Sequence, residues 1–190
     1  MIVFNKPFGV LCQFTDQTVP SRPTLAAYGL PPDVYPAGRL DFDSEGLLLL
    51  SDDGARIAQV SSPKFKWPKT YVVQVEGDPD EAQLRALCEG VELNDGPTQP
   101  ASARRLESVP DWLWPRTPPI RVRKTVPDAW IELTIREGRK RQVKRMLEEV
   151  GHRVYTLERV AYGPLRLGSL QPGEFRKLGQ PEVERLRELG

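Results

Sequence analysis

Three carboxylic acids lie within five positions, directly ahead of four consecutive leucines. Asp41, Asp43 and Glu45 come first, and Gly46 separates them from the leucines at 47–50. A carboxylate held on a rigid loop can attack a carbon atom or accept a proton, and two carboxylates can divide acid and base work. A two-carboxylate glycosidase is weakly supported, because the acids share one loop and no partner motif occurs elsewhere. A polar turn ahead of a core strand would account for the same residues.

The four leucines predict the element that positions these acids. The run is bounded by Gly46 and by the turn signal Asp52-Asp53-Gly54, and it is too short to span a membrane. It therefore predicts a short strand that is buried on both faces. The acids emerge at the edge of that strand, and loops fixed to a rigid scaffold often carry catalytic residues.

The string GRLDFDSEGLLLLSDDG at 38–54 resembles the catalytic-aspartate motif of the RsuA/RluB/RluE-type RNA pseudouridine synthases. The resemblance extends to the family's opening motif (Asn-Lys-Pro-x-Gly at 5–9), its second motif (Lys-x-Tyr at 69–71) and its third (EGRKRQVKRML at 137–147). Many members carry an RNA-binding S4 domain before the opening motif. This sequence leaves no room for one, so it resembles the RluE branch, the catalytic part alone.

The resemblance implies a role for five residues. Asp41 corresponds to the catalytic aspartate, and Arg39 to the arginine that fills the space left by a flipped base. Tyr71 corresponds to the tyrosine under the target base. Lys144 corresponds to the basic residue that pairs with the catalytic aspartate, and Val143 to an apolar residue beneath the active site. The implied reaction is the isomerisation of one uridine in 23S, large-subunit ribosomal RNA, with no cofactor and no metal.

These roles have physical reasons, and some have alternatives. A fixed cation keeps a partly desolvated aspartate charged, and a flat ring on a strand suits base stacking. Flipping the uridine out of a helix costs a few kcal/mol. Tyr71 lies among valines at 72, 73 and 75, and a tyrosine in such surroundings is more often a core or half-buried packing residue. Asp43 and Glu45 are expected to shape the loop by hydrogen bonds rather than to act as a second catalytic acid.

Basic residues are concentrated in one region. Between Arg104 and Arg145 there are 12 Lys or Arg against five acids, a balance of +7, whereas the rest of the chain sums to −6. This segregation is typical of proteins that meet phosphate, although a solvated charged face would look the same. Residues expected to contact RNA are Lys6, Arg39, Arg121, Arg123, Lys124, Arg139, Arg141 and Val143.

The segment 110–127 holds five prolines, two tryptophans and four basic residues. It resembles an insertion of the RluE branch, and it cannot form a regular helix. Its indole rings could stack on unstacked bases. Trp112 and Trp114 could equally pin the loop to the core, and both alternatives stay open.

Hydrophobic patterns predict the remaining elements. The strands expected are 1–4, about 10–14, 69–76, 130–135 and 154–161, with two short strand pieces in 165–178. The helices expected are 24–28, 55–60, one capped by Asp78 with a stripe at Leu84, Leu87, Cys88 and Val91, one from about 139 to 150 with a stripe at Val143, Met146, Leu147 and Val150, and 181–189. On the 139–150 helix, Arg141, Lys144 and Arg145 are expected to form a cationic cluster.

The expected fold is α+β, with a mixed, largely antiparallel sheet, flanking helices and two lobes around a basic cleft. We expect one catalytic domain over 1–190, with lobe one at about 1–66 plus 165–190 and lobe two at about 67–164. Lobe two has a ferredoxin-like βαβ pattern. The site should lie in the cleft between the lobes.

Composition excludes several classes of protein. With 39% hydrophobic and 28% charged residues the chain is typical of a globular protein, and it lacks a signal peptide or a membrane span. Cys12, Cys88 and His152 are too few for a disulfide framework, a zinc site or a Ser-His-Asp triad, and His152 suits a structural role. We expect a cytoplasmic monomer. The alternatives are a synthase for another RNA and a non-catalytic, RNA-binding ribosome-assembly factor.

Overall fold

The computed structural model describes residues 1–62, 64–121 and 123–188, and the chain divides into two units. Unit 1 is Met1–Trp67 with Arg159–Gly190, and unit 2 is Pro68–Glu158. The boundary lies inside strand β9 (Val154–Tyr162), six residues before the division expected at 165. Pro63, Val122, Leu189 and Gly190 lie outside the described residues, so the predicted end of the last helix at 189 is not tested.

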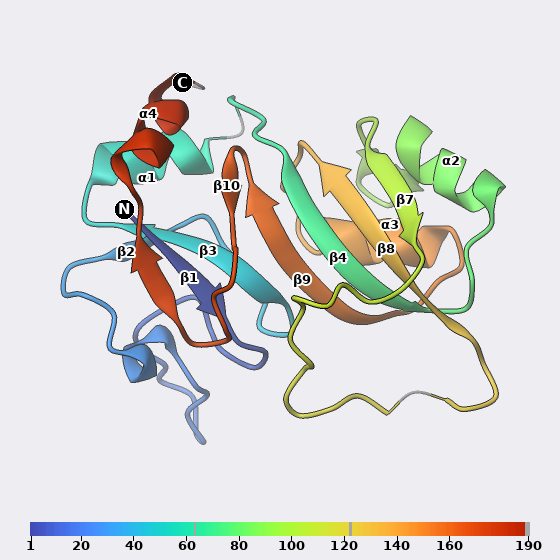
Figure 1. Cartoon of the computed structure of the whole chain (residues 1–190), viewed down its shortest axis with the longest axis horizontal. Coiled ribbons are helices and arrows are strands. Elements are labelled where there is room, and N and C mark those ends of the chain that lie inside the picture. The colour runs from blue at the N-terminus through green and yellow to red at the C-terminus, as the bar shows by residue number, and fades with distance from the viewer. Residues whose placement is uncertain (63, 122, 189–190) are drawn as a thin grey trace. The chain divides into compact units, whose positions relative to one another are not determined.

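The leucine run forms β3 (Glu45–Ser51), and every residue of this strand is buried. β1 (Ile2–Lys6) pairs with it antiparallel, with Phe4 opposite Leu48. The other strands of unit 1 are β2 (Tyr35–Ala37), β10 (Leu165–Arg166) and β11 (Phe175–Lys177). β2 lies on β3 and β11 on β1, both antiparallel (Figure 1). The predicted buried strand is confirmed, and it is the strand from which the Asp41 loop departs.

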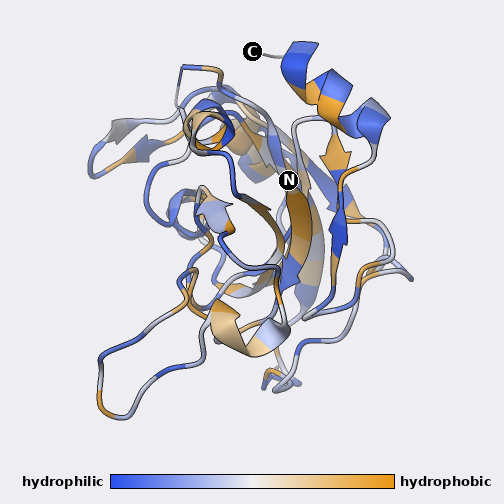
Figure 2. Cartoon of the chain, turned by 90° about the vertical axis from the view of Figure 1, so that its left-hand side faces the viewer, coloured by the Kyte–Doolittle hydropathy of each residue, from blue (hydrophilic) through white to orange (hydrophobic). Residues whose placement is uncertain are grey.

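Three short helices complete unit 1: the 3-10 helix η1 (Leu25–Tyr28), α1 (Gly54–Ser61) and α4 (Gln180–Glu188). Asp53 caps α1, because its carboxylate accepts hydrogen bonds from the amides of Ala55 and Arg56. α4 is mostly hydrophilic with a narrow hydrophobic stripe (Figure 2). Leu186 of that stripe lines a small hollow with Val60 of α1 and Trp67. The helices predicted at 24–28, 55–60 and the C-terminus are thus present.

In unit 2, β4 (Lys69–Glu76), β8 (Asp128–Ile135) and β7 (Ser102–Leu106) pair antiparallel in that order, and the first half of β9 lies on the other side of β4. Alternate residues of β4 and β8 point into one core, with Tyr71 opposite Leu133 and Val73 opposite Ile131. Helices α2 (Glu81–Glu89) and α3 (Gln142–Glu149) pack on that face through Leu87 and Met146. β5 (Glu92–Leu93) and β6 (Gly96–Pro97) form a separate hairpin. The predicted α+β class with mostly antiparallel strands is confirmed.

Three local predictions were wrong. Residues 10–14 form no strand, because this segment makes only an isolated bridge between Leu11 and Thr24. α2 is capped by Asp80 instead of Asp78, since Asp80 and Gln83 exchange side-chain and backbone hydrogen bonds in a capping box. α3 begins at Gln142 instead of 139, because Arg141 has a left-handed φ of 51° that an α-helix cannot contain.

None of the helices in the described part of the chain has the length and apolar character that crossing a bilayer requires.

Candidate active site

The loop that carries Asp41 is held by hydrogen bonds along its backbone. The Ser44 amide donates to the Asp41 carbonyl oxygen at 3.1 Å, which closes a turn around the acid. The Gly9 amide, from the Asn-Lys-Pro-x-Gly segment, donates to the carbonyl oxygen of Phe42 at 2.9 Å. Two strings far apart in sequence therefore meet at Asp41. The Asp41 side chain itself is half-buried, as a reactive group that must meet a substrate needs to be.

Cys12 holds the loop from a second side. Its thiol donates to the Leu40 carbonyl oxygen at 3.2 Å, and the Leu40 amide donates back to the Cys12 sulfur at 3.3 Å. The backbone N–H and C=O of Leu40, the residue before Asp41, are therefore both bonded to Cys12. Sequence reasoning treated Cys12 only as a missing disulfide or zinc ligand. A lone cysteine carries no sequence signal of this role.

Lys6 is a buried cation close to the acids. It is fully buried at the end of β1, and its ammonium donates to the carbonyl oxygens of Pro7 at 2.8 Å and Val10 at 2.9 Å. Burial lowers the pKa of Lys6 to about 8, an effect opposed by the electrostatic influence of Cys12, Glu45, Asp43 and Asp41. The structure thus brings Lys6 and the three acids into one electrostatic group. A side chain with no exposed surface does not itself meet an RNA.

Arg159 of β9 reaches the two ends of the same loop. It is only 3% exposed, and it donates through Nε to the Leu47 carbonyl oxygen at 2.8 Å. Its Nη1 donates to the Arg39 carbonyl oxygen at 3.4 Å. Its Cζ lies 5.1 Å from the centre of the Tyr162 ring, a cation–π contact. Sequence reasoning missed Arg159, which follows Glu158 and precedes the apolar residues Val160 and Ala161, so its position in the sequence does not mark it as a residue that holds the loop.

In unit 2, three of the predicted site residues lie on the core elements. Tyr71 on β4 and Val143 on α3 belong to the same buried cluster, and they are 8% and 4% exposed. Lys144 follows Val143 in the first turn of α3 and is itself buried, at 6%. A lysine with so little exposed surface is unusual unless its charge is compensated. Of the three residues predicted to form a cationic cluster on this helix, Arg141 is exposed, Lys144 is buried and Arg145 bonds to Asp95.

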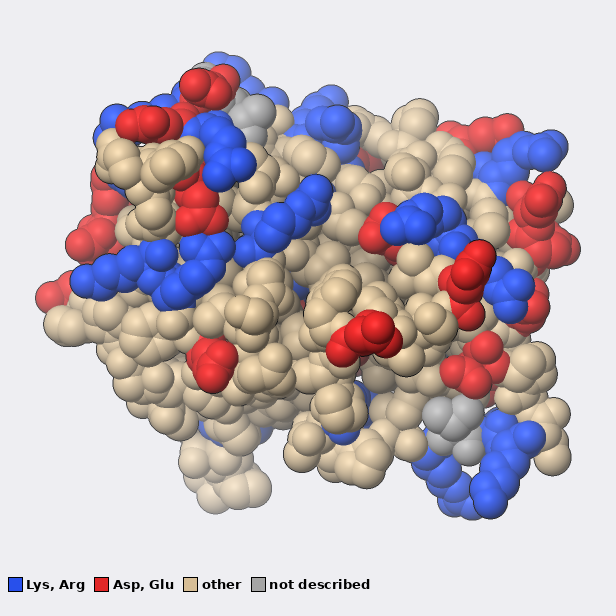
Figure 3. All heavy atoms as spheres, in the orientation of Figure 1, with Lys and Arg blue, Asp and Glu red and all other residues tan. Residues whose placement is uncertain are grey.

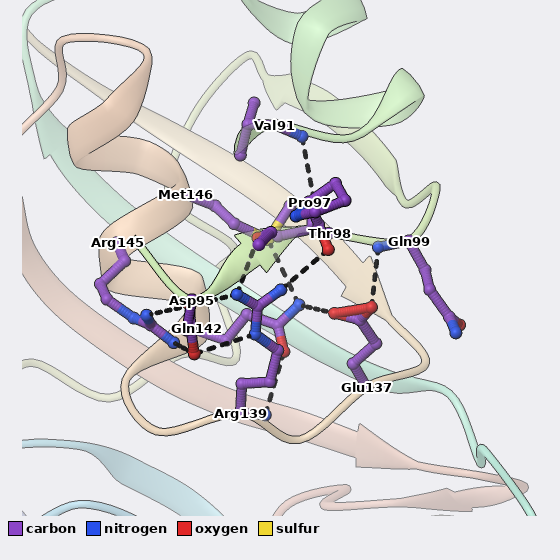
Figure 4. Close-up of polar contacts among 11 residues, drawn as sticks. Val91, Asp95, Pro97, Thr98, Gln99, Glu137, Arg139, Gln142, Arg145 and Met146 are labelled. Atoms are coloured by element: carbon purple, nitrogen blue, oxygen red, sulfur yellow. Dashed lines mark hydrogen bonds and ion pairs between the residues drawn. The ribbon is translucent and has the colours of Figure 1, made fainter. Parts of the chain in front are cut away.

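Arg145 and Arg139 instead converge on Asp95, at the turn of the β5–β6 hairpin (Figure 4). The Arg145 Nη1 donates to Asp95 at 2.7 Å, and the Arg139 Nε donates to the other carboxylate oxygen at 3.2 Å. Arg139 also donates to the carbonyl oxygens of Pro97 at 3.0 Å and Gly96 at 2.8 Å. Arg139 and, next, Arg145 hold the pKa of Asp95 well below its usual range. The turn between β8 and α3 is therefore fastened to the hairpin.

A second contact fixes that turn from the other side. The Glu137 carboxylate accepts hydrogen bonds from the Gln99 amide at 2.7 Å and from the Gln142 side chain (Figure 4). Gln142 in turn accepts from the Arg139 amide at 3.1 Å. The third motif string is therefore a rigid turn in which charged side chains hold one another. The exposed Arg141 sits within it.

The two tryptophans of the loop between β7 and β8 have different surroundings. Trp112 is 50% exposed, whereas Trp114 is buried at 7%. Arg121 and Lys124 are exposed, and Arg123 lies 3.9 Å from Glu76 in an open ion pair. In the orientation of Figure 1, Lys and Arg side chains gather at the lower right, where this loop lies (Figure 3).

His152 is a structural residue, as expected. It is buried, and its two ring nitrogens lie 2.9 Å from the Glu76 carbonyl oxygen and 3.0 Å from Gln83 Oε1.

The predicted site residues thus fall into two sets. The first set lies in unit 1 and consists of Lys6, Arg39 and Asp41, joined by the unpredicted Cys12 and Arg159. The second lies in unit 2 and consists of Tyr71, Val143, Lys144, Arg139, Arg141, Arg121, Arg123 and Lys124, joined by the unpredicted Asp95. An Asn-Asp-Gly turn signal at 94–96 could have located Asp95.

The known proteins to which this chain is similar include several pseudouridine synthases. The model of a family described as RNA pseudouridylate synthase matches residues 1–149. Ribosomal large subunit pseudouridine synthase E of Xanthomonas campestris pv. campestris is 62% identical over 176 residues, 93% of this chain and 94% of that protein. The protein of the same name from Vibrio vulnificus is 48% identical over 181 residues, 95% of this chain and 76% of that protein.

Solved structures add two comparisons. A crystal structure described as a pseudouridylate synthase has a TM-score of 0.79 at 35% identity and covers 97% of this chain and 72% of that one. Human RNA pseudouridylate synthase domain containing 1 has a TM-score of 0.53 at 16% identity, with 97% of this chain and 90% of that one covered, which is a likeness of fold alone.

Proposed function

Because the chain belongs to the RNA pseudouridylate synthase family, in its RluE branch, we propose that it converts one uridine of 23S, large-subunit ribosomal RNA to pseudouridine. The protein is an RNA pseudouridine synthase. The choice of RNA rests on the names of the Xanthomonas and Vibrio relatives, which are large-subunit enzymes. A substrate of this kind also implies action in the cytoplasm, where bacterial ribosomes are assembled.

We assign the catalytic carboxylate to Asp41. Isomerisation breaks the bond between C1′ and N1, turns the base and rejoins it through C5, so the enzyme needs one well-placed carboxylate and no cofactor. The observation that carries the assignment is the fixed backbone around Asp41, which accepts the Ser44 amide and lies between Leu40 and Phe42, both tied to other segments. Its side chain keeps some exposure while Glu45 beside it is buried.

Three further residues take roles in handling the uridine. Tyr71 stacks on the uracil, because its ring is held on a rigid strand of unit 2. Lys144 supplies the cation that keeps the reacting carboxylate charged, with Val143 packed beside it. Arg39 is exposed two residues before Asp41 and fills the space that the flipped base leaves.

The remaining basic residues divide by their contacts. Arg121, Arg123 and Lys124 are exposed and bind phosphate groups of the RNA. Exposed Arg141 does so next to α3. The burial of Lys6 and the bonds of Arg139 to Asp95 favour positioning roles for these two residues over direct RNA contact.

The test is to incubate the purified protein with unmodified large-subunit RNA, small-subunit RNA and transfer RNA, and to map pseudouridine at single-nucleotide resolution. The proposal predicts conversion of one uridine, in the large-subunit RNA alone. Conversion of a uridine in another RNA would mean that the substrate is that RNA and not large-subunit RNA. Binding to large-subunit RNA and to large-subunit particles without conversion in either would favour the non-catalytic assembly factor.

A further inference from the structure

We propose that Arg159 is the positioning residue for the catalytic loop, since its guanidinium holds the carbonyl groups of Arg39 and Leu47 at the two ends of the segment that carries Asp41. The inference rests on the proposed role of Asp41. It gives β9 a role in catalysis, although Arg159 lies outside the motif segments 5–9, 38–54, 69–71 and 137–147.

The shape of the Arg159 guanidinium suits it to this role. A guanidinium is a planar fork of donors that can hold two acceptors at a fixed spacing, which an ammonium cannot do. Nε of Arg159 takes the Leu47 carbonyl at 2.8 Å, after the loop, and Nη1 takes the Arg39 carbonyl at 3.4 Å, before it. A single rigid group thus sets the distance between the beginning and the end of the loop.

The Arg159 side chain and backbone are themselves held in place by their neighbours. Its side chain is 3% exposed and lies against the Tyr162 ring, whose hydroxyl donates to the Val60 carbonyl oxygen at 2.9 Å. Its backbone passes so close to β3 that a Cβ on Gly46 would lie 2.3 Å from the Arg159 carbonyl oxygen. Gly46 also has a φ of +103°, which favours glycine. Gly46, the last residue before the leucines, therefore packs directly against the backbone of Arg159.

The Arg159 guanidinium has more hydrogen-bond donors than it uses. Nη2 of Arg159 is buried and has no hydrogen-bond partner among the described residues. Burying a charged group with one donor unused is an arrangement that proteins rarely keep without a reason. With almost no exposed surface, the side chain does not contact RNA. We therefore attribute the burial of this charge to the loop that it holds.

The test compares Arg159→Lys and Arg159→Met with Arg176→Lys, a matched control in the same unit. Arg176 also bonds a backbone carbonyl, that of Arg166, and pairs with Glu182, but it touches no part of the loop. We measure the single-turnover rate with saturating enzyme, the RNA affinity, the melting temperature and amide hydrogen exchange at 40–46.

Arg159→Lys should slow the single-turnover rate on the order of 100-fold, the effect of a displacement of about 1 Å at a reacting group. RNA affinity should stay within about threefold, because Arg159 contacts no RNA. Amide exchange at 40–46 should become faster. Arg176→Lys should change neither the rate nor this exchange, even if it lowers the melting temperature.

Two results would overturn the proposal. Full activity of Arg159→Lys with loss in Arg159→Met would mean that the charge matters and the two-carbonyl fork does not. Unchanged exchange at 40–46 in Arg159→Lys would mean that the loop is held by other contacts. Asp41→Asn is measured alongside: if it stays active, the catalytic assignment fails, while the exchange measurement still decides the role of Arg159.

Discussion

At the scale of single residues, the main finding is a buried cation beside three acids. The Lys6 ammonium donates hydrogen bonds to the carbonyl oxygens of Pro7 and Val10, so one side chain both holds the 7–10 segment and supplies a positive charge. The negative groups around it oppose the effect of burial on its pKa. A change in its charge therefore alters the surroundings of Asp41, Asp43 and Glu45 together.

The pKa of Lys6 makes a prediction about stability and pH. Below pH 8 the lysine is protonated in both folded and unfolded chains. Between pH 8 and its ordinary value of 10.5 the folded protein releases the proton first, so this group makes the free energy of unfolding rise with pH. The rise should be on the order of 3 kcal/mol, at 1.36 kcal/mol for each unit of pKa.

The measurement is urea unfolding of the wild type and of Lys6→Arg from pH 7 to 10.5. An arginine stays charged throughout this range, so the variant lacks the rise. If Lys6→Arg fails to fold, Lys6→Met serves as the reference. A wild-type minus variant difference that is flat with pH would contradict the lowered pKa of Lys6.

At the scale of elements, the proposed site residues are carried by loops and by regular elements alike: Asp41 lies on a loop, Tyr71 on β4 and Lys144 on α3. The loop of 110–127 contains a buried and an exposed tryptophan two positions apart. This difference separates the two roles that the sequence left open. Trp114 suits an anchor, and Trp112 suits a stacking surface.

Trp112→Ala should weaken RNA binding by about 1–3 kcal/mol, the usual loss of one base–aromatic stack, and should leave the free energy of unfolding unchanged. Trp114→Ala is the matched variant, and it should lower the free energy of unfolding by about 3–5 kcal/mol. RNA titrations and urea unfolding of both variants check this. The division of roles is wrong if Trp112→Ala binds RNA as the wild type does.

The sequence located the long strands β4 and β8 but neither β7 nor the beginnings of α2 and α3, for physical reasons. Alternation in 69–76 and 130–135 located β4 and β8, because one buried face imposes that pattern. Asp78 and Asp80 are both good caps, and Gln83 decided for Asp80 by completing the capping box. Residues such as Arg159 and Cys12 could not be assigned, because their partners are backbone atoms far away in the sequence.

At the scale of the whole molecule, the basic region is less free than its charge count indicates. Arg104 pairs with Glu132, Arg105 with Asp78, and Arg139 and Arg145 share Asp95. Two of these acids lie outside the segment that the count covered. Exposed basic residues of this segment remain in two places. Arg121, Arg123 and Lys124 lie in the loop of 110–127, and Arg136, Lys140 and Arg141 lie between β8 and α3.

Changing Arg121, Arg123 and Lys124 together to Gln should lower RNA affinity and flatten its salt dependence. Each lost phosphate contact removes about 0.7–0.9 from the slope of log K against log salt, so three removed contacts change it by about 2–3. The control changes Arg85, Arg185 and Arg187, which are exposed on α2 and α4, to Gln. An equal loss of slope in the control would mean that total charge, and not this loop, sets the affinity.

The central claim is that Asp41 is the catalytic carboxylate, and the most direct test is the single-turnover rate of Asp41→Asn beside Asp43→Asn. Both variants remove one negative charge from the same loop. We predict a loss on the order of 10⁴-fold or more for Asp41→Asn, as for other removed nucleophiles, with RNA affinity and melting temperature close to wild type. Asp43→Asn should keep most of the rate. An active Asp41→Asn, or an equal loss in Asp43→Asn, would contradict the assignment.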